Sequence, residues 1–225
     1  MQAEVMTLRL FNLESKFYRF MTRVADCIVL SLLWIVFYLP VVTCGAASAA
    51  LYYAMHKVLH DMGEGTVKEF WRGFKMNLKQ ATLVWLLNIA QVTFVVGDLF
   101  LIYRTQGTSG VVFKAFAVFA IVAVAWTLFW FPYLARFEAK TGVVLKNSFI
   151  LMTMNLGSSI LLLADFAAAA ALAVFLYYIP LVPLFVPGLY AMCANLVLEK
   201  VFAKYMTDGA EEPQSEPLQE KSGNA

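Results

Sequence analysis

Carboxyl and amide side chains inside long apolar stretches are the residues of this sequence best placed to do chemistry. Asp165 lies in Leu163-Ala164-Asp165-Phe166, near the middle of the apolar stretch 149–177. An ionisable group in the hydrocarbon costs at least about 2.5 kcal/mol, so it usually contacts an ion, a proton or a substrate. Amides that could face it from neighbouring helices are Asn88, Gln91, Asn155 and Asn195. We call these five residues the intramembrane polar set; they predict either a solute or proton site or hydrogen bonding within the protein.

Basic and aromatic residues recur at helical spacing in segment 60–80. Phe70, Phe74 and Leu78 fall opposite a second group, which we call the basic face: Lys68, Trp71, Arg72, Lys75 and Lys79, with Trp71 at its edge. This pattern predicts an amphipathic helix at the inner headgroup layer. Each Lys or Arg near an anionic leaflet contributes about 1 kcal/mol, so the face suits either lipid anchoring or docking of a cytoplasmic partner.

The start of the chain repeats this pattern. Apolar Phe17, Phe20, Met21 and Val24 oppose basic Lys16, Arg19 and Arg23.

Motifs for enzymatic chemistry are missing from the sequence. It contains no G-x-x-x-x-G-K-[ST] phosphate loop, no H-E-x-x-H and no Ser or Cys nucleophile spaced from a base. Cys27, Cys44 and Cys193 are scattered in apolar sequence, and His56 has no spaced partner beyond His60, so neither a metal nor another cofactor is expected. The net charge of +2 gives no field that would recruit nucleic acid. We predict that the protein is not an enzyme.

The elements that must position these residues are transmembrane helices. Hydrophobic residues make up 61% of the chain and charged residues 14%, whereas a soluble domain has roughly a quarter charged. Lipid can supply the apolar environment that so small a protein could not provide itself. Six apolar stretches are visible: 24–39, 42–59, 81–103, 113–135, 149–177 and 181–198. We predict a polytopic all-α bundle of about six helices over 1–206, with 207–225 as a disordered cytoplasmic tail.

Charge placement predicts the topology. With six spans and both termini in the cytoplasm, every Lys and Arg except Arg104 and Lys114 faces the cell interior, as the positive-inside rule requires. The external connections are then short and lie around Pro40, 104–112 and 178–183. We expect no extracellular domain, and any recognition takes place in the membrane or the cytoplasm.

Small residues at helical spacing predict close helix packing. The second stretch carries Gly45, Ala46, Ala49, Ala50 and Ala54, and the fifth carries alanines over 167–171. Such residues let backbones approach each other, as in a packed bundle or in the sliding surface of a transporter. The sequence alone leaves both interpretations open.

An ordered series of short runs resembles the YesL-like family of bacterial integral membrane proteins over nearly the whole chain. The runs are Leu10-Phe11-Asn12-Leu13-Glu14-Ser15, Tyr18-Arg19-Phe20, Ala25-Asp26, Leu39-Pro40-Val41-Val42-Thr43-Cys44-Gly45-Ala46, Ala50-Leu51-Tyr52-Tyr53, 74–82, Ala135-Arg136-Phe137-Glu138 and Leu198-Glu199-Lys200. Glu14 departs from the usual aspartate, and Cys44 stands where an aliphatic residue is expected. The family has no known molecular function, and the resemblance carries over no site residues.

The resemblance implies a setting rather than a mechanism. Family members are associated mainly with Gram-positive bacteria and are encoded beside binding-protein-dependent carbohydrate uptake systems. The expectation is a multi-pass protein of the bacterial plasma membrane that assists an ABC sugar transporter and contacts its subunits. Two alternatives stay open: an independent permease using Asp165, and a lipid-interacting structural protein.

Overall fold

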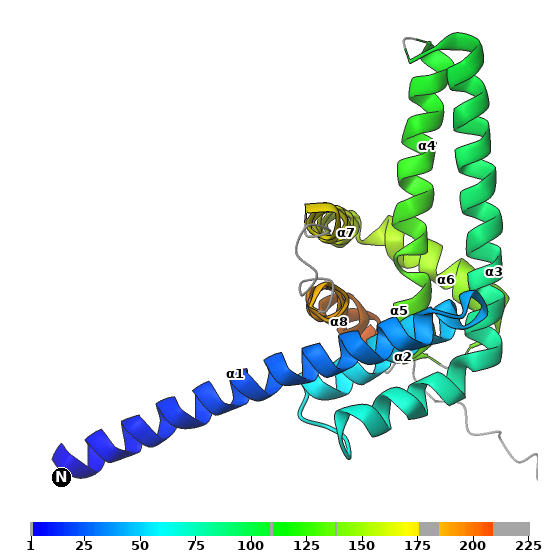
Figure 1. Ribbon diagram of the computed structural model, residues 1–225. Helices are drawn as coiled ribbons and strands as arrows, with labels where there is room; N and C mark the ends of the chain where they lie inside the picture. Colours follow the sequence, from blue (N-terminus) through cyan, green and yellow to red (C-terminus); the bar gives the residue numbers. More distant parts are fainter. Residues whose placement is uncertain (1, 109, 138, 176–184, 209–225) are drawn as a thin grey trace, which may run out of the picture.

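The computed structural model describes residues 2–108, 110–137, 139–175 and 185–208, and every element assigned in these ranges is helical (Figure 1). The elements are α1 (Gln2–Tyr38), the short 3-10 helix η1 (Val41–Thr43), α2 (Cys44–Leu59), α3 (Thr66–Gln106), α4 (Val111–Thr127), α5 (Trp130–Arg136), α6 (Thr141–Met154), α7 (Leu156–Phe175) and α8 (Val186–Asp208). The predicted all-α fold class is confirmed.

Five helical segments are long and apolar enough to cross a membrane. They are Met21–Tyr38, Thr66–Thr105, Val111–Arg136, Leu156–Val174 and Val186–Tyr205. Their exposed faces carry large apolar side chains, such as Phe94 at 63% and Val174 at 74% exposure. A bilayer would cover these side chains, so the chain is a multi-pass membrane protein.

The predicted second span forms α2, which is a buried central helix of 16 residues rather than a sixth long span. It contacts α1, α3, α5 and α8. Ala46, Ala49, Ala50 and Ala54 are fully buried. The small residues noticed in the sequence therefore serve close packing at the centre of the molecule.

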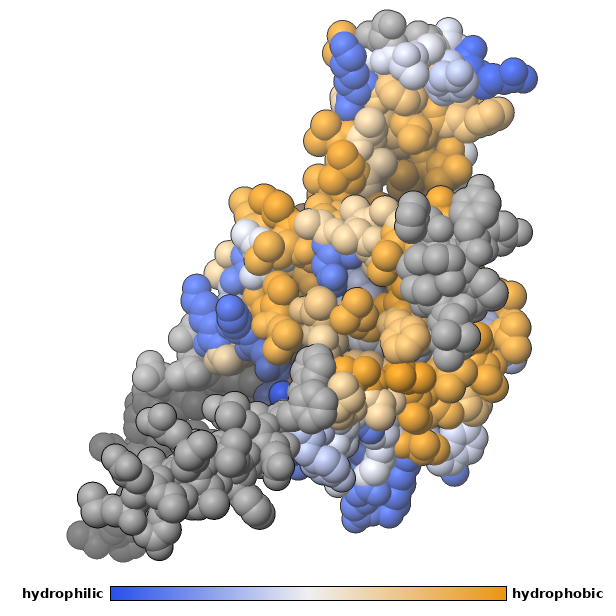
Figure 2. Space-filling view, turned by 60° about the vertical axis from the view of Figure 1, so that its left-hand side comes forward, coloured by the Kyte–Doolittle hydropathy of each residue, from blue (hydrophilic) through white to orange (hydrophobic). Residues whose placement is uncertain are grey.

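Helix α3 combines the predicted amphipathic segment 60–80 and the predicted span 81–103 in one continuous helix. Its 41 residues correspond to about 60 Å, twice the thickness of the hydrocarbon. In Figure 1 its first part lies beside α1 and α2, after which the helix changes direction and pairs with α4. The α3–α4 hairpin ends in a tip near Arg104 and Gly107, which is polar in Figure 2, while its sides are apolar.

The turn around Pro40 lies beside the part of α3 that follows residue 80. The predicted six-span topology has Pro40 outside and residue 80 inside, on opposite faces of the membrane. In the structure Thr82 Oγ1 lies 3.3 Å from the carbonyl oxygen of Val42, and Gln80 bonds the carbonyl oxygen of Ala139 at 2.5 Å. The α1–α2 hairpin therefore crosses the base of the α3–α4 hairpin, because the start of α2 packs directly on α3 there.

The fourth and fifth apolar stretches are each divided. The fourth breaks after Thr127, because Pro132 has no N–H for the carbonyl of Leu128 and its ring would clash with that carbonyl. The fifth, predicted as one span over 149–177, breaks at Asn155 between α6 and α7. The Asn155 side chain bonds the Leu151 carbonyl at 3.0 Å and so competes with the helix backbone.

The long helices do not share one axis. In Figure 1 the α3–α4 hairpin is seen lengthwise, whereas α7 and α8 are seen end-on. Helix α8 begins at Val186 and continues past the predicted end at residue 198 to Asp208. Residues 181–184 and 209–225, which belong to the predicted sixth span and tail, lie outside the described residues.

Candidate functional site

The intramembrane polar set is dispersed through the structure. Gln91 donates to the carbonyl of Ala123 at 3.1 Å, and Asn195 donates to the carbonyl of Ala191 at 2.8 Å. Asn155 donates to Leu151 and also to the hydroxyl of Tyr205, at 3.1 Å. No hydrogen bond joins any two members of the set, all of which are described. Gln91 thus bonds across to α4 and Asn155 across to α8, Asn195 bonds within α8, and Asn88 is buried in α3. These amides do not converge on one shared site.

Asp165 is the exception within this set, because its Oδ2 is buried without a hydrogen-bond partner. Its carboxyl interacts electrostatically with Tyr52, Tyr190 and Cys193. The ring of the adjacent Phe166 lies 6.3 Å from that of Tyr190. The carboxyl of α7 thus approaches α2 and α8 at two phenols and a thiol, none of which bonds Oδ2.

The basic face is exposed along the first part of α3. Lys68, Trp71, Arg72, Lys75 and Lys79 all face outward. The other side of the helix is fixed in the core by Phe70 and Phe74, which are 1% and 6% exposed. Leu78, predicted to share that buried side, is instead 37% exposed.

Aromatic packing holds Trp71 in place on the basic face. Its ring stacks on Phe74 with 5.7 Å between centroids, and Phe37 of α1 lies 5.7 Å away. The Lys75 ammonium sits 4.9 Å above the Trp71 ring. The face therefore combines positive charge with an anchored indole, a composition suited to headgroups or a protein partner.

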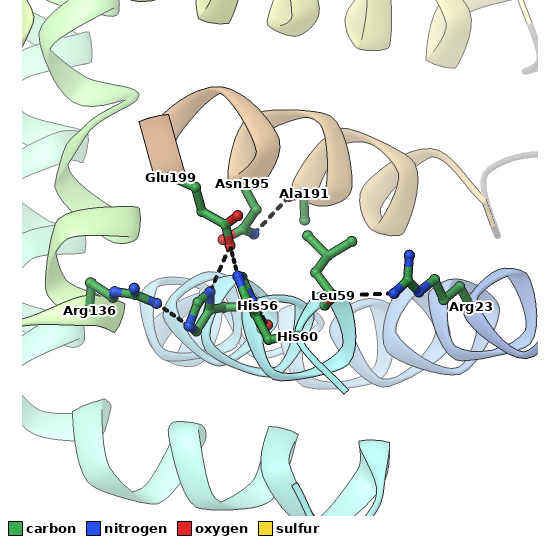
Figure 3. A network of polar contacts seen from close by, with 8 residues as sticks. All are labelled: Arg23, His56, Leu59, His60, Arg136, Ala191, Asn195 and Glu199. Carbon is green, nitrogen blue, oxygen red and sulfur yellow. Dashed lines mark hydrogen bonds and ion pairs between the residues drawn. The ribbon is translucent and has the colours of Figure 1, made fainter. Parts of the chain in front are cut away.

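A polar cluster joins α2, α5 and α8 (Figure 3). Its residues are not among the site residues predicted from the sequence. His56 Nδ1 lies 2.9 Å from Glu199 Oε1, and His60 Nε2 lies 3.3 Å from the same oxygen. Arg136 Nη1 donates to His56 Nε2, and His60 Nδ1 donates to the His56 carbonyl at 2.9 Å. The only signal in the sequence was the spacing of four between the histidines, which places them on one helix face.

The donors in this cluster fix the protonation of His56. A guanidinium can only donate, so His56 Nε2 must be the acceptor and Nδ1 must carry the proton given to Glu199. His56 is therefore neutral. Burial and the Arg136 charge lower the pKa of His56, which lies at the end of α2, outside the five candidate spans, and Glu199 opposes this shift.

The end of α2 is tied to α1 at the same end of the molecule. Arg23 Nη2 lies 3.3 Å from the Leu59 carbonyl and 3.5 Å from Asp61 Oδ2. Thr66, at the start of α3, donates to Asp26 Oδ1 at 2.5 Å. Arg23, His56 and the start of the basic face therefore lie at one end of the α1–α2 hairpin.

A cavity of about 320 Å³ lies between α5, α6 and α8, lined mainly by apolar and aromatic side chains. Its hydroxyls already have donors: Asn147 Nδ2 lies 2.7 Å from Tyr133 Oη, and Asn155 bonds Tyr205. Because its lining is apolar and its hydroxyls are already paired, the cavity suits an apolar ligand, such as a lipid acyl chain, better than a polar solute.

Fold and surface together define a multi-pass α-helical membrane protein. It carries the basic face and, at the helix ends, the polar cluster of His56, His60, Arg136 and Glu199. The family described as "Protein of unknown function, DUF624" matches residues 27–99, from the second half of α1 into α3. The uncharacterized protein YteU of Bacillus subtilis (strain 168) is 27% identical over 186 residues, which cover 80% of this chain and 82% of that protein. Both similarities support the resemblance to the YesL-like family that the sequence runs indicate. No solved structure matches it.

Proposed function

We propose that the protein is a non-enzymatic accessory component of the bacterial plasma membrane that assists carbohydrate uptake by an ABC transporter. The observation that carries this proposal is the basic face, whose five side chains are exposed while Phe70 and Phe74 hold the same helix rigidly in the core. A rigid, charged and partly aromatic helix face is suited to recognition. The family resemblance supplies the link to carbohydrate uptake.

The partner surface is expected to be acidic and cytoplasmic. Four positive charges on one side of a helix steer association with negative surfaces, and Trp71 adds an anchor that desolvates on contact. Glu64 pairs with Lys68, which leaves Arg72, Lys75 and Lys79 as the charges of this face without an ion pair to a described residue. These three residues are the ones to change.

Co-purification tests the proposal. The full chain is tagged, expressed in its host on a carbohydrate carbon source, and purified in mild detergent. We expect subunits of a carbohydrate ABC transporter in the eluate, and their loss with the triple variant Arg72→Glu, Lys75→Glu, Lys79→Glu. The control reverses Arg104 and Lys114, at the other end of the α3–α4 hairpin, and keeps the partner. Retention of the partner by the triple variant, or its absence from the wild-type eluate, contradicts the proposal.

A second candidate function, an independent permease, is favoured by the carboxyl of Asp165, whose Oδ2 is buried without a hydrogen-bond partner. A buried carboxyl oxygen without a hydrogen bond lowers the stability of the folded protein. A role in transport is one reason for such a residue to be present. The test is uptake of labelled sugars by vesicles containing only this protein, with Asp165→Asn as the variant. Uptake that disappears in Asp165→Asn supports the permease and displaces the accessory role; no uptake by the wild type removes it.

The third reading, a lipid-interacting structural protein, uses the same basic face. Binding that needs only anionic vesicles, with no transporter subunit in the eluate, would favour it. The triple variant would then lose vesicle binding as well.

A further inference from the structure

The cluster at the end of α2 brings together three groups that ligate metals. One ligand atom each of His56, His60 and Glu199 lies within 4.8 Å of the other two, and Glu199 Oε1 is 2.9 Å from His56 Nδ1 and 3.3 Å from His60 Nε2. Two histidines four residues apart project from one face at the end of α2, and Glu199 approaches from α8 (Figure 3). Paired histidines at this spacing with a carboxylate from a second helix are a chelating arrangement for Zn²⁺.

We infer that His56, His60 and Glu199 form a binding site for a late first-row divalent cation, with Zn²⁺ as the reference ion. Two imidazoles select Zn²⁺, Ni²⁺ or Cu²⁺ over Mg²⁺ and Ca²⁺, which prefer oxygen ligands throughout. Three protein ligands leave a fourth position of the tetrahedron for water or for a partner's side chain.

The surroundings of His60 match those of a metal ligand. Its Nδ1–H donates to the His56 carbonyl at 2.9 Å, and its Nε2 lies 3.3 Å from Glu199 Oε1, so Nε2 is the ring nitrogen that faces the other two ligands. Metal-bound histidines are held in this way, with the second ring nitrogen donating to a carbonyl or a carboxylate. The His60 side chain is 38% exposed, so a cation can enter from solvent.

Arg136 makes the site conditional. Without metal, His56 carries its proton on Nδ1 and accepts from Arg136 through Nε2. Binding at Nδ1 moves that proton to Nε2, where the Arg136 donor can no longer bond, so the guanidinium must leave. Metal binding thus gives up the Arg136–His56 contact between α5 and α2 and replaces the His56–Glu199 hydrogen bond by a metal bridge between α2 and α8. The positive charge of Arg136 weakens the site.

The test uses the full chain, purified in detergent with a tag free of histidine and stripped with a chelator. Titration with Zn²⁺ alone should give one bound ion per chain, measured by calorimetry and by elemental analysis after dialysis. His60→Ala and Glu199→Gln should each weaken binding about tenfold or more, as loss of a ligand or its support does. Arg136→Met should bind Zn²⁺ at least as tightly as the wild type, because it removes a competing positive charge.

Glu64→Gln is the matched control, since it removes an exposed carboxylate nearby that is not a ligand. The absorption spectrum of the Co²⁺-loaded chain reports nitrogen and oxygen ligands directly and should change in His60→Ala. A His60→Ala chain that unfolds, as judged by its elution and helicity, is replaced by His60→Gln. Less than one Zn²⁺ per wild-type chain, or affinities unchanged in His60→Ala and Glu199→Gln, overturns the inference.

Discussion

A Cβ atom at Gly45 would lie 2.3 Å from the carbonyl oxygen of Ala81. It would also lie 2.7 Å from the Cβ of Trp85. The start of α2 therefore touches the backbone of α3 where the Pro40 turn meets the base of the α3–α4 hairpin. This contact allows no side chain at all, and it determines how the two hairpins cross.

Gly45→Ala should destabilise the protein by about 1–3 kcal/mol, because the new methyl group meets main-chain atoms that cannot rotate away. The measurement is the midpoint of thermal unfolding in detergent. Gly97→Ala is the matched control, since a Cβ there has no atom within 4 Å, and it should leave the midpoint nearly unchanged. Equal midpoints for Gly45→Ala and the wild type would show that α2 and α3 do not pack this closely.

A second close contact joins α1 to the start of α8. The Gly188 N–H donates to Ser31 Oγ at 2.8 Å, and both residues are buried. Ser31→Ala leaves that N–H without a partner and should cost about 1–3 kcal/mol. Ser48→Ala, also on a helix but only partly buried, is the comparison and should cost less. The unfolding midpoint again reports the difference, and a harmless Ser31→Ala would refute the importance of the bond.

Asp165→Leu should stabilise the protein if the carboxyl has only a functional role. Its Oδ2 is buried and unpartnered, and such a group costs about 1–3 kcal/mol that leucine would recover. Asp98→Leu, near the polar tip of the α3–α4 hairpin, serves as the comparison, because water can solvate the native carboxylate there. A lower unfolding midpoint for Asp165→Leu would mean that the carboxyl has a structural partner.

The class of the protein and the faces of α3 could be predicted from the sequence because hydropathy and helical period act locally. Phe70 and Phe74 are buried at the expected spacing, whereas Leu78 is exposed. The break at Asn155 had a local signal, an asparagine followed by Gly157, but hydropathy over a long window hid it.

The polar cluster of His56, His60, Arg136 and Glu199 could not be predicted in the same way. His56 and Glu199 are 143 residues apart, and nothing local indicates that they meet. The same holds for Thr82 and Val42, which the topology predicted from charge has on opposite faces of the membrane. Both contacts depend on packing between helices that are far apart in the sequence.

Accessibility of single cysteines tests the crossing of the two hairpins. In a variant lacking Cys27, Cys44 and Cys193, a cysteine replaces Val41 and is probed in intact cells with a thiol reagent that cannot cross the membrane. Val41 is 65% exposed, so a substituted thiol is sterically free to react. Because the Pro40 turn lies beside Thr82, we expect labelling only after permeabilisation, as for a Lys75→Cys chain.

The second reference in this experiment is Thr108→Cys at the tip of the α3–α4 hairpin, which should react in intact cells. The simple six-span topology gives the opposite result for Val41→Cys, because it places the Pro40 turn outside with Thr108. Labelling of Val41→Cys and Thr108→Cys alike in intact cells would therefore restore α1 and α2 as two antiparallel spans. If Val41→Cys and Lys75→Cys are both protected in intact cells, α1, α2 and the first part of α3 lie on the inner side of the membrane. Only the α3–α4 hairpin then separates positions 41 and 75 from Thr108 at its tip.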